Sequence, residues 1–137
     1  MIPRYTNPEM SAIWTDEARY TIWLEIERCA LEGLVLVGQA PQEALDAYNK
    51  SASFSAERVN EIEREVKHDV IAFLTNVAEY VGPLSRFVHK GMTSSDVVDT
   101  CLAVQLRRAG MLLDSKVEAL LEVIKTRALE FKHTACI

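Results

Sequence analysis

This 137-residue sequence has few cysteines and no long uncharged apolar run. Its three cysteines are odd in number and form no CxxC pair, which favours a reduced setting in which the thiols act as small apolar groups. No stretch reaches the ~18 uncharged apolar residues of a membrane span. The N-terminal MIPRYTNPEM lacks the apolar core of a secretory signal. We therefore expect a cytoplasmic protein with no membrane partner.

Positive charge is also scarce, because 15 Lys and Arg stand against 20 Asp and Glu and the net charge is −5. This balance excludes a general nucleic-acid binder, which needs clustered basic residues. It leaves room for a small anionic ligand, since a local pocket can be positive on an acidic protein. The histidines at 68, 89 and 133 have no metal-ligand spacing, and no glycine-rich phosphate loop or GxSxG motif occurs. We expect neither a metal nor a cofactor.

Apolar residues recur at helical spacing through most of the chain, and the strict alternation of strands is absent. Thr15 is a good N-cap for a helix that should end near Gly38. Ser55 is the next cap, and a single apolar stripe follows it from 59 to 77. Gly82-Pro83 should end that stripe. These patterns predict an all-α fold.

The segments between these helices are predicted from prolines and charge. Met1 to Pro8 should be an extended arm, because its two prolines fix the backbone. Pro41 can open a short helix over Gln42 to Lys50. Six glutamates look like solvated helix faces, partly paired with arginines: Glu25, Glu27, Glu57, Glu61, Glu63 and Glu65.

The longest helical stretch runs from Ser94 to about His133, with no proline and a single glycine. A helix of ~40 residues is roughly 60 Å long, whereas a compact chain of this length has a radius of gyration of only ~14 Å. The helix should therefore project, and its apolar stripe needs partners that this chain does not supply. The sequence reaches Ile137 without a glycine or proline that would close a domain. We favour a piece of a longer chain over a protomer of a helical oligomer, and we expect the uncovered face to cause self-association.

The start of this helix gathers small hydroxyl residues beside a histidine, in the stretch FVHKGMTSSDVVDT. Thr93 and Asp96 fit a capping box, and capping alone explains most such clusters. The alternative is an anion site, because free N–H groups and a partial positive charge at a helix N-terminus bind carboxylates and phosphates. His89, just upstream, is by itself more often a surface or structural residue than a functional one.

Two further polar groups are candidates for chemistry. His68, within Lys67-His68-Asp69, would point about 200° away from the apolar stripe of its own helix if that helix ran straight. It either faces solvent, with Asp69 as an N-terminal charge after a kink, or is presented to a cleft, where an imidazole can donate or accept a proton. Arg4-Tyr5 could bind an anionic group, although an exposed arm residue beside a packed ring is the favoured interpretation for that pair alone.

Three motifs in register resemble adenylosuccinate lyase of the bacterial type, within the fumarase/aspartase superfamily. The first is R-Y-x-x-P-E-M-S-x-I-W from Arg4 to Trp14, and the second is K-H-D-V-x-A-F from Lys67 to Phe73. The third is V-H-x-G-x-T-S-S-D-V-V-D-T from Val88 to Thr100. The T-S-S-D-V helix start is shared across the superfamily, while the first two motifs point to the adenylosuccinate branch.

The resemblance implies an all-α fold in which a small N-terminal helical domain, here 1–93, leads into the first long helix of a central bundle, here 94–137. It also implies a homotetramer whose active sites form from three subunits. The family's G-R-[ST]-H-G motif, with a catalytic histidine, should begin just after Ile137, and the loop with the catalytic serine lies further on. The 137-residue chain alone is therefore expected to be inactive.

The family reaction is a β-elimination that converts adenylosuccinate to AMP and fumarate, and the related succinyl-carboxamide ribotide to its carboxamide and fumarate. The resemblance implies that Thr93 and Ser94 hold a succinyl carboxylate, and that Arg4 and Tyr5 bind the nucleotide near its phosphate. Lys67, His68 and Asp69 would line the same site, with His68 assisting the acid or orienting substrate. His89 would lie nearby, at the phosphate. Which histidine is acid or base stays open.

Two alternatives compete with this interpretation. Argininosuccinate lyase or a cycloisomerase shares the Thr-Ser helix start but is not expected to carry K-H-D-V with the R-Y start. A non-catalytic helical oligomerisation module would explain the apolar stripe equally well. Such a module has no need of the polar set Arg4, His68, Thr93 and Ser94, and this set distinguishes the two hypotheses.

Overall fold

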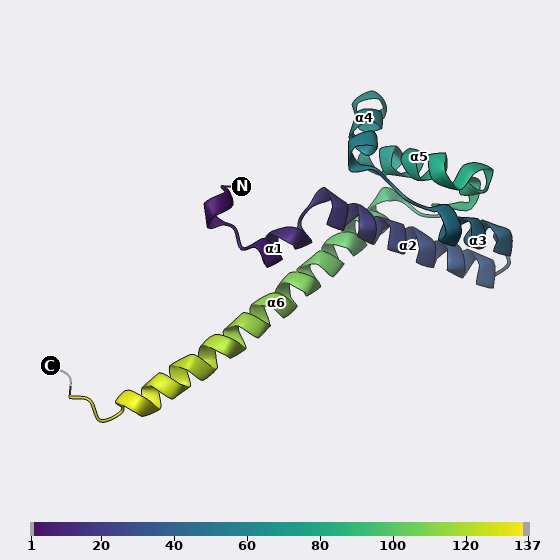
Figure 1. The fold of residues 1–137 in the computed structure, drawn as a ribbon. Helices are drawn as coiled ribbons and strands as arrows, with labels where there is room; N and C mark the ends of the chain where they lie inside the picture. The colour runs from purple at the N-terminus through teal and green to yellow at the C-terminus, as the bar shows by residue number, and fades with distance from the viewer. Residues whose placement is uncertain (1, 136–137) are drawn as a thin grey trace.

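The computed structural model describes residues 2–135 and contains no strand within that range. The elements in order are η1 (Pro3–Tyr5), α1 (Pro8–Ile13), α2 (Asp16–Leu36), α3 (Gln42–Ser51), α4 (Ala56–Val66), α5 (Asp69–Val81), η2 (Gly82–Phe87) and α6 (Ser94–Phe131), where η marks a 3-10 helix. Figure 1 shows α2 to α5 gathered into a head, from which α6 projects. The predicted all-α class is confirmed.

The predicted caps form as hydrogen bonds. Thr15 Oγ1 accepts from the Ala18 N–H at 3.1 Å, and Ser55 Oγ accepts from the Arg58 N–H at 3.3 Å. Gly38 follows the end of α2 with a φ of 71°, a left-handed conformation that glycine adopts without a steric penalty. The short helix predicted from Gln42 extends one residue further than expected, to Ser51.

The predicted stripe from 59 to 77 is divided between α4 and α5, and of the two alternatives, a straight helix or a kink before Asp69, the structure has the break. Lys67 has a φ of 55° and ends α4, and His68 is extended and caps α5. The apolar residue before the break, Val66, is exposed and contributes nothing to the core. The apolar period continues across the break, so periodicity alone could not reveal it.

The predicted extended arm is wrong in part. Pro3–Tyr5 forms one turn of 3-10 helix, and Pro8 begins α1 instead of continuing the arm. Asn7 caps α1, since its Oδ1 accepts from the Met10 N–H at 3.1 Å. Proline is well suited to a first helical position, because its missing N–H would have no partner there anyway.

The core of the head is an aromatic cluster from three segments. Tyr20 and Trp23 of α2 pack in edge-to-face geometry with centroids 5.3 Å apart. Phe73 of α5 stacks on Tyr20 at 5.5 Å and meets the Trp23 ring edge-on at 5.3 Å. Phe54, between α3 and α4, closes the cluster against Tyr20 at 5.6 Å. Such rings contribute more than their buried area, so this cluster holds α5 on α2.

Polar contacts join the first turn of α4 to the end of α5. The buried Asn76 accepts from the Ser55 N–H at 2.8 Å and donates to Glu79 at 2.9 Å. Glu79 also pairs with Arg58 at 2.8 Å. The helices α4 and α5 therefore form a braced hairpin, and its turn carries Lys67-His68-Asp69.

Tyr48 on α3 is buried, and its hydroxyl donates to the Leu24 carbonyl oxygen at 2.9 Å. Burial raises the pKa of Tyr48, and the Glu27 carboxylate adds to the rise. Because the folded pKa is raised, the unfolded chain ionises this phenol first, from about pH 10 upward. Its contribution to stability is therefore complete below that pH and is lost as the pH rises toward the folded value.

Replacing Tyr48 with phenylalanine is expected to lower the free energy of unfolding near neutral pH by about 1 kcal/mol, because the hydrogen bond to Leu24 is lost. The variant should also lose less stability than the unsubstituted protein when the pH rises above about 10. Urea unfolding on both sides of that pH measures both effects. Tyr80→Phe, at an exposed tyrosine, is the matched control. If the unsubstituted protein and Tyr48→Phe lost the same amount of stability at alkaline pH, this assignment would be contradicted.

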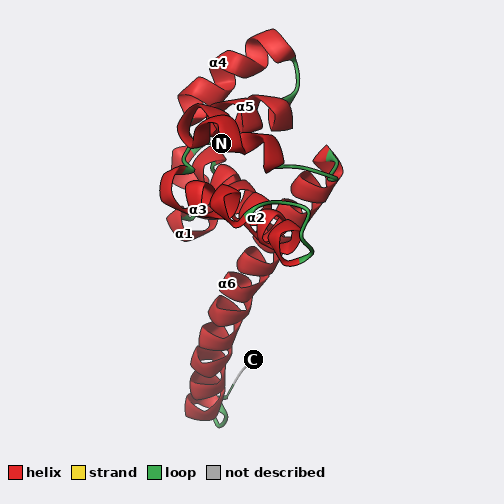
Figure 2. Cartoon of the chain, turned by 90° about the vertical axis from the view of Figure 1, so that its right-hand side faces the viewer, coloured by secondary structure: helices red, strands yellow, loops and turns green. Residues whose placement is uncertain are grey.

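The long helix α6 has 38 residues, as the sequence predicted, and only its first half packs on the head. Val97, Cys101, Gln105 and Ala109 are buried there, against α1 and α2. Figure 2 shows the rest of α6 extending away from the other helices. Large apolar side chains are exposed along both halves of α6: Leu102, Leu106, Met111, Leu113, Val117, Leu120, Leu121, Val123, Ile124, Leu129 and Phe131.

The predicted projection of α6 with exposed apolar side chains is confirmed, while a partner for α6 and self-association of the chain stay predictions. The division into 1–93 and 94–137 also stays a prediction, and its last two residues lie outside the described range. Among residues 2–135 no helix is both long and apolar enough to cross a membrane.

Candidate active site

Two helix N-termini meet at the candidate site. His68, the N-cap of α5, lies with its Nε2 3.3 Å from the Oγ of Ser94, the first residue of α6. The His68 Nδ1 accepts from the Ile71 N–H at 3.4 Å. In the neutral imidazole the proton therefore sits on Nε2 and can be donated toward Ser94. The α4–α5 hairpin thus brings together two motifs that lie 26 residues apart.

The start of α6 contains the predicted cap and, beside it, a serine hydroxyl with a different partner. The Asp96 carboxylate accepts from the Thr93 N–H at 2.9 Å, and the Asp96 N–H donates to the Thr93 carbonyl oxygen at 3.0 Å. The capping interpretation is therefore correct for Thr93 and Asp96. The Ser94 hydroxyl instead contacts His68. At α5 the Val70 and Ile71 N–H groups are taken up by Asp69 and His68, so the free N–H groups at this junction belong to the start of α6. Together with the partial positive charge of a helix N-terminus, they favour an anion at this junction.

Lys67 and Asp69 flank His68 on the same turn. Lys67 is exposed and, with Asn60, Glu63 and Arg64, lines a depression of about 530 Å³. Asp69 Oδ1 lies 3.6 Å from the His68 Nδ1 and accepts from the Val70 N–H at 2.7 Å. Five of the predicted site residues therefore gather at one place: Lys67, His68, Asp69, Thr93 and Ser94.

His89 occupies a different environment, on the segment between η2 and α6. Its Nδ1 lies 2.6 Å from the Oε1 of Glu27, on α2. The Glu27 side chain is 0% exposed and that of His89 is 16% exposed. Burial raises the pKa of Glu27, and the hydrogen bond from His89 partly offsets that rise.

The prediction that Glu27 belongs to a solvated face is wrong, and a signal for its burial was present. Glu27 lies four residues after Trp23 and four before Leu31, both of which are buried. It therefore occupies the apolar face of α2, where side chains at i and i+4 share one side of a helix. A glutamate at such a position needs a buried partner, and His89 supplies it.

Arg4 and Tyr5 lie apart from this cluster. Both are exposed on η1, and the Arg4 guanidinium carbon is 4.9 Å from the centre of the Tyr5 ring. No hydrogen bond or ion pair within residues 2–135 joins them to His68 or Ser94. In Figure 1 the purple N-terminal turn, η1, lies beyond α1 and away from the α4–α5 hairpin.

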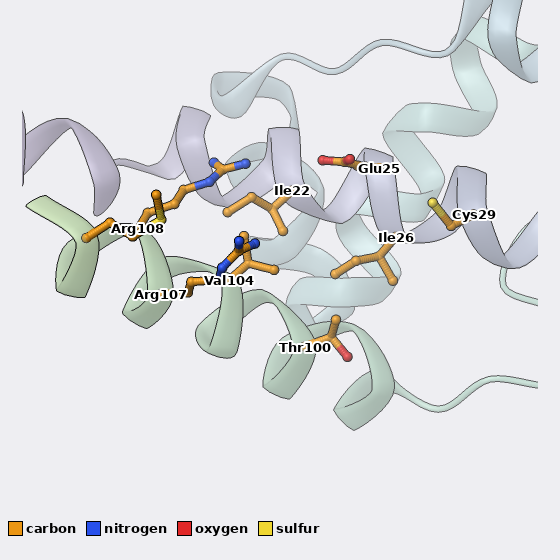
Figure 3. Close-up of a pocket in the computed structure, with 9 residues that line it drawn as sticks. Ile22, Glu25, Ile26, Cys29, Thr100, Val104, Arg107 and Arg108 are labelled. Atoms are coloured by element: carbon orange, nitrogen blue, oxygen red, sulfur yellow. The ribbon is translucent and has the colours of Figure 1, made fainter.

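A second hollow lies between α2 and α6 and contains none of the predicted site residues. This groove of about 420 Å³ has an apolar floor and charged edges. Figure 3 shows Ile22 and Ile26 of α2 opposite Val104 of α6, with Glu25 on one rim and Arg107 on the other. Within the described residues, no group of three or more His, Cys, Asp or Glu could hold a metal ion.

Comparison with known proteins then decides the family. A family model described as lyase matches residues 3–137. The chain belongs to this lyase family. It is 47% identical over 137 residues to the adenylosuccinate lyase of Synechocystis sp., covering 100% of this chain and 32% of that protein. It is 45% identical over 134 residues to the adenylosuccinate lyase of Bacillus subtilis, covering 98% of this chain and 31% of that protein.

The chain thus spans about a third of the length of these two lyases, and the predicted resemblance is confirmed. The fold agrees as well. The crystal structure of fumarate lyase from Mesorhizobium sp. superposes with a TM-score of 0.82 at 18% identity, over 90% of this chain and 30% of that one. At that identity the likeness concerns the fold alone.

Proposed function

We propose that the full-length protein is a cytoplasmic lyase that cleaves adenylosuccinate to AMP and fumarate, and succinyl-carboxamide ribotide to its carboxamide and fumarate. Two relatives named adenylosuccinate lyase, each at least 45% identical across nearly all of this chain, support the substrate class. The observation that carries the proposal here is the 3.3 Å contact between His68 and Ser94, which joins an imidazole to the N-terminus of α6.

The proposed reaction suits this junction. A base takes the proton from the carbon beside a succinyl carboxylate, and the resulting negative charge spreads into that carboxylate. The C–N bond then breaks and an acid protonates the leaving nitrogen, so fumarate and the amine form with no net gain or loss of protons. Thr93 and Ser94 would hold the carboxylate against the α6 N–H groups, which stabilise charge that grows in the intermediate. His68 would orient the substrate or assist the acid.

The remaining predicted residues have binding roles in this proposal. Lys67 and Asp69 would line the site beside His68, and His89 would face the substrate phosphate. Arg4 and Tyr5 would bind the nucleotide. Their distance from the cluster in one chain suits a homotetramer in which neighbouring subunits complete each site. The uncovered apolar face of α6 supports such an assembly.

That same face also favours the second candidate, a non-catalytic helical oligomerisation module. The module hypothesis explains the long exposed stripe on α6, but it gives no role to an imidazole and a serine hydroxyl placed together at two helix starts. If the site is catalytic, alanine at these two positions should leave the assembly intact and should lower stability only by the about 1 kcal/mol that the His68 cap of α5 contributes. Collapse of the oligomer would favour the module.

Ultraviolet absorbance with the full-length protein tests the proposal. Adenylosuccinate should be consumed, argininosuccinate should not, and the 137-residue chain alone should turn over neither. Turnover of argininosuccinate only would move the protein to that branch of the superfamily. No turnover of either by the full-length protein would favour the oligomerisation module, and turnover by the short chain would refute the assignment of essential groups beyond Ile137.

A further inference from the structure

The buried pair of Glu27 and His89 links the middle of α2 to the segment that leads into α6. The two residues lie 62 positions apart, and the Oε1 and Nδ1 atoms are 2.6 Å apart. His89 has a φ of 62°, a left-handed conformation that costs a non-glycine residue energy. Four residues later Thr93 caps α6. The pair therefore fixes the segment that delivers Thr93 and Ser94 to the candidate site.

A purely structural link between α2 and this segment does not explain why the pair is a glutamate and a histidine. Burying a carboxylate is costly, and the second Glu27 oxygen is buried with no hydrogen-bond partner. Replacing a buried ion pair with apolar residues of similar volume is often neutral or stabilising, so stability is a weak reason for such a pair. A carboxylate behind an imidazole does supply something an apolar contact cannot. It fixes which ring nitrogen points inward and how the ring is oriented.

The opposite edge of the His89 ring remains available. No hydrogen bond within residues 2–135 engages its Nε2, and the side chain is still 16% exposed. Because Nδ1 is engaged by Glu27, Nε2 is the ring nitrogen left for another partner. His89 lies on the segment that leads into α6 at Ser94.

We propose that Glu27 is a positioning residue for substrate binding, which acts by holding His89 with its Nε2 turned toward an anionic group of the bound substrate. This rests on the proposed function, in which His89 belongs to the substrate site. Glu27 is sealed inside the head and does not touch substrate. Its effect should therefore appear in KM and should depend entirely on the presence of His89.

Steady-state kinetics of the full-length protein with adenylosuccinate test this. Glu27→Gln keeps the side chain's shape and should raise KM about tenfold with kcat within about twofold of the unsubstituted protein, because the charged acceptor that orients the ring is lost. Glu27→Asp keeps the charge, so its KM should lie between that of Glu27→Gln and that of the unsubstituted protein. The matched control is Glu32→Gln, an exposed glutamate on the same helix whose partner is Arg28. Its KM should not change.

A double-mutant cycle separates positioning from general stability. If Glu27 acts through His89, Glu27→Gln should add less than about twofold to the KM of His89→Gln. The inference would be overturned if the KM increases of the two single variants multiplied in the double variant. An unchanged KM in Glu27→Gln would overturn it as well. If Glu27→Gln does not fold, Glu27→Asp decides: a raised KM that disappears in the His89→Gln background supports positioning, and an unchanged KM overturns it. No turnover by the unsubstituted protein would instead refute the proposed function, and this inference with it.

Discussion

Alanine in place of His68 in the full-length protein is expected to lower kcat by about 10²–10⁴-fold, the range that a positioned proton-transfer group contributes. The imidazole lies at the α6 start, with Nε2 3.3 Å from the Ser94 hydroxyl. Its loss removes a donor at the place where the proposed reaction develops charge. Stopped assays of adenylosuccinate consumption at saturating substrate measure the effect.

Two controls accompany this prediction: alanine substitutions at the neighbouring serines, and a measurement of the stability of His68→Ala. Ser94→Ala should lower kcat/KM, whereas Ser95→Ala, one position along α6 and exposed, should leave it within about twofold. His68 also caps α5, so His68→Ala should cost about 1 kcal/mol of stability. A His68→Ala protein that assembles normally and retains nearly full kcat would remove this histidine from the chemistry.

Alanine in place of Phe73 is expected to destabilise the protein by about 3–5 kcal/mol, because it deletes a ring from the centre of the head and leaves a cavity. Phe73 is 0% exposed and meets the rings of Tyr20, Trp23 and Phe54. Since a domain's total stability is only about 5–15 kcal/mol, this single change should remove a large part of it. Urea unfolding followed by circular dichroism measures the loss.

Two other substitutions calibrate the Phe73 result. Tyr80→Ala, on the same helix but 45% exposed, should cost less than about 1 kcal/mol. Phe73→Leu keeps an apolar side chain in place and should cost less than Phe73→Ala. Equal losses for Phe73→Ala and Tyr80→Ala would mean that the aromatic cluster does not hold α5 on α2.

Local chemistry predicted most of the secondary structure. Thr15 and Ser55 start helices because their hydroxyls accept from the first free N–H groups, and α6 is long because no proline interrupts it. The secondary-structure prediction failed at two places where two local signals gave conflicting indications. The apolar period runs through Lys67-His68 although the backbone breaks there, and Pro8 resembled a breaker although Asn7 made it a helix start.

The candidate site was predictable by motif and not by geometry. The residue types at Lys67-His68-Asp69 and Thr93-Ser94 indicated which side chains to follow, but their meeting depends on how the α4–α5 hairpin packs against the start of α6. Periodicity carries no information about such long-range packing. Glu27 was missed because a glutamate is usually solvated, although its position on the apolar face of α2 indicated burial.

A substrate-bound structure of the full-length protein is the most direct test of the central claim that the junction of α5 and α6 is the substrate site. The slow His68→Ala variant should trap adenylosuccinate for crystallography. We predict a succinyl carboxylate within hydrogen-bond distance of Ser94 and the first N–H groups of α6. A substrate lodged in the groove between α2 and α6, with no carboxylate at Ser94, would contradict the account.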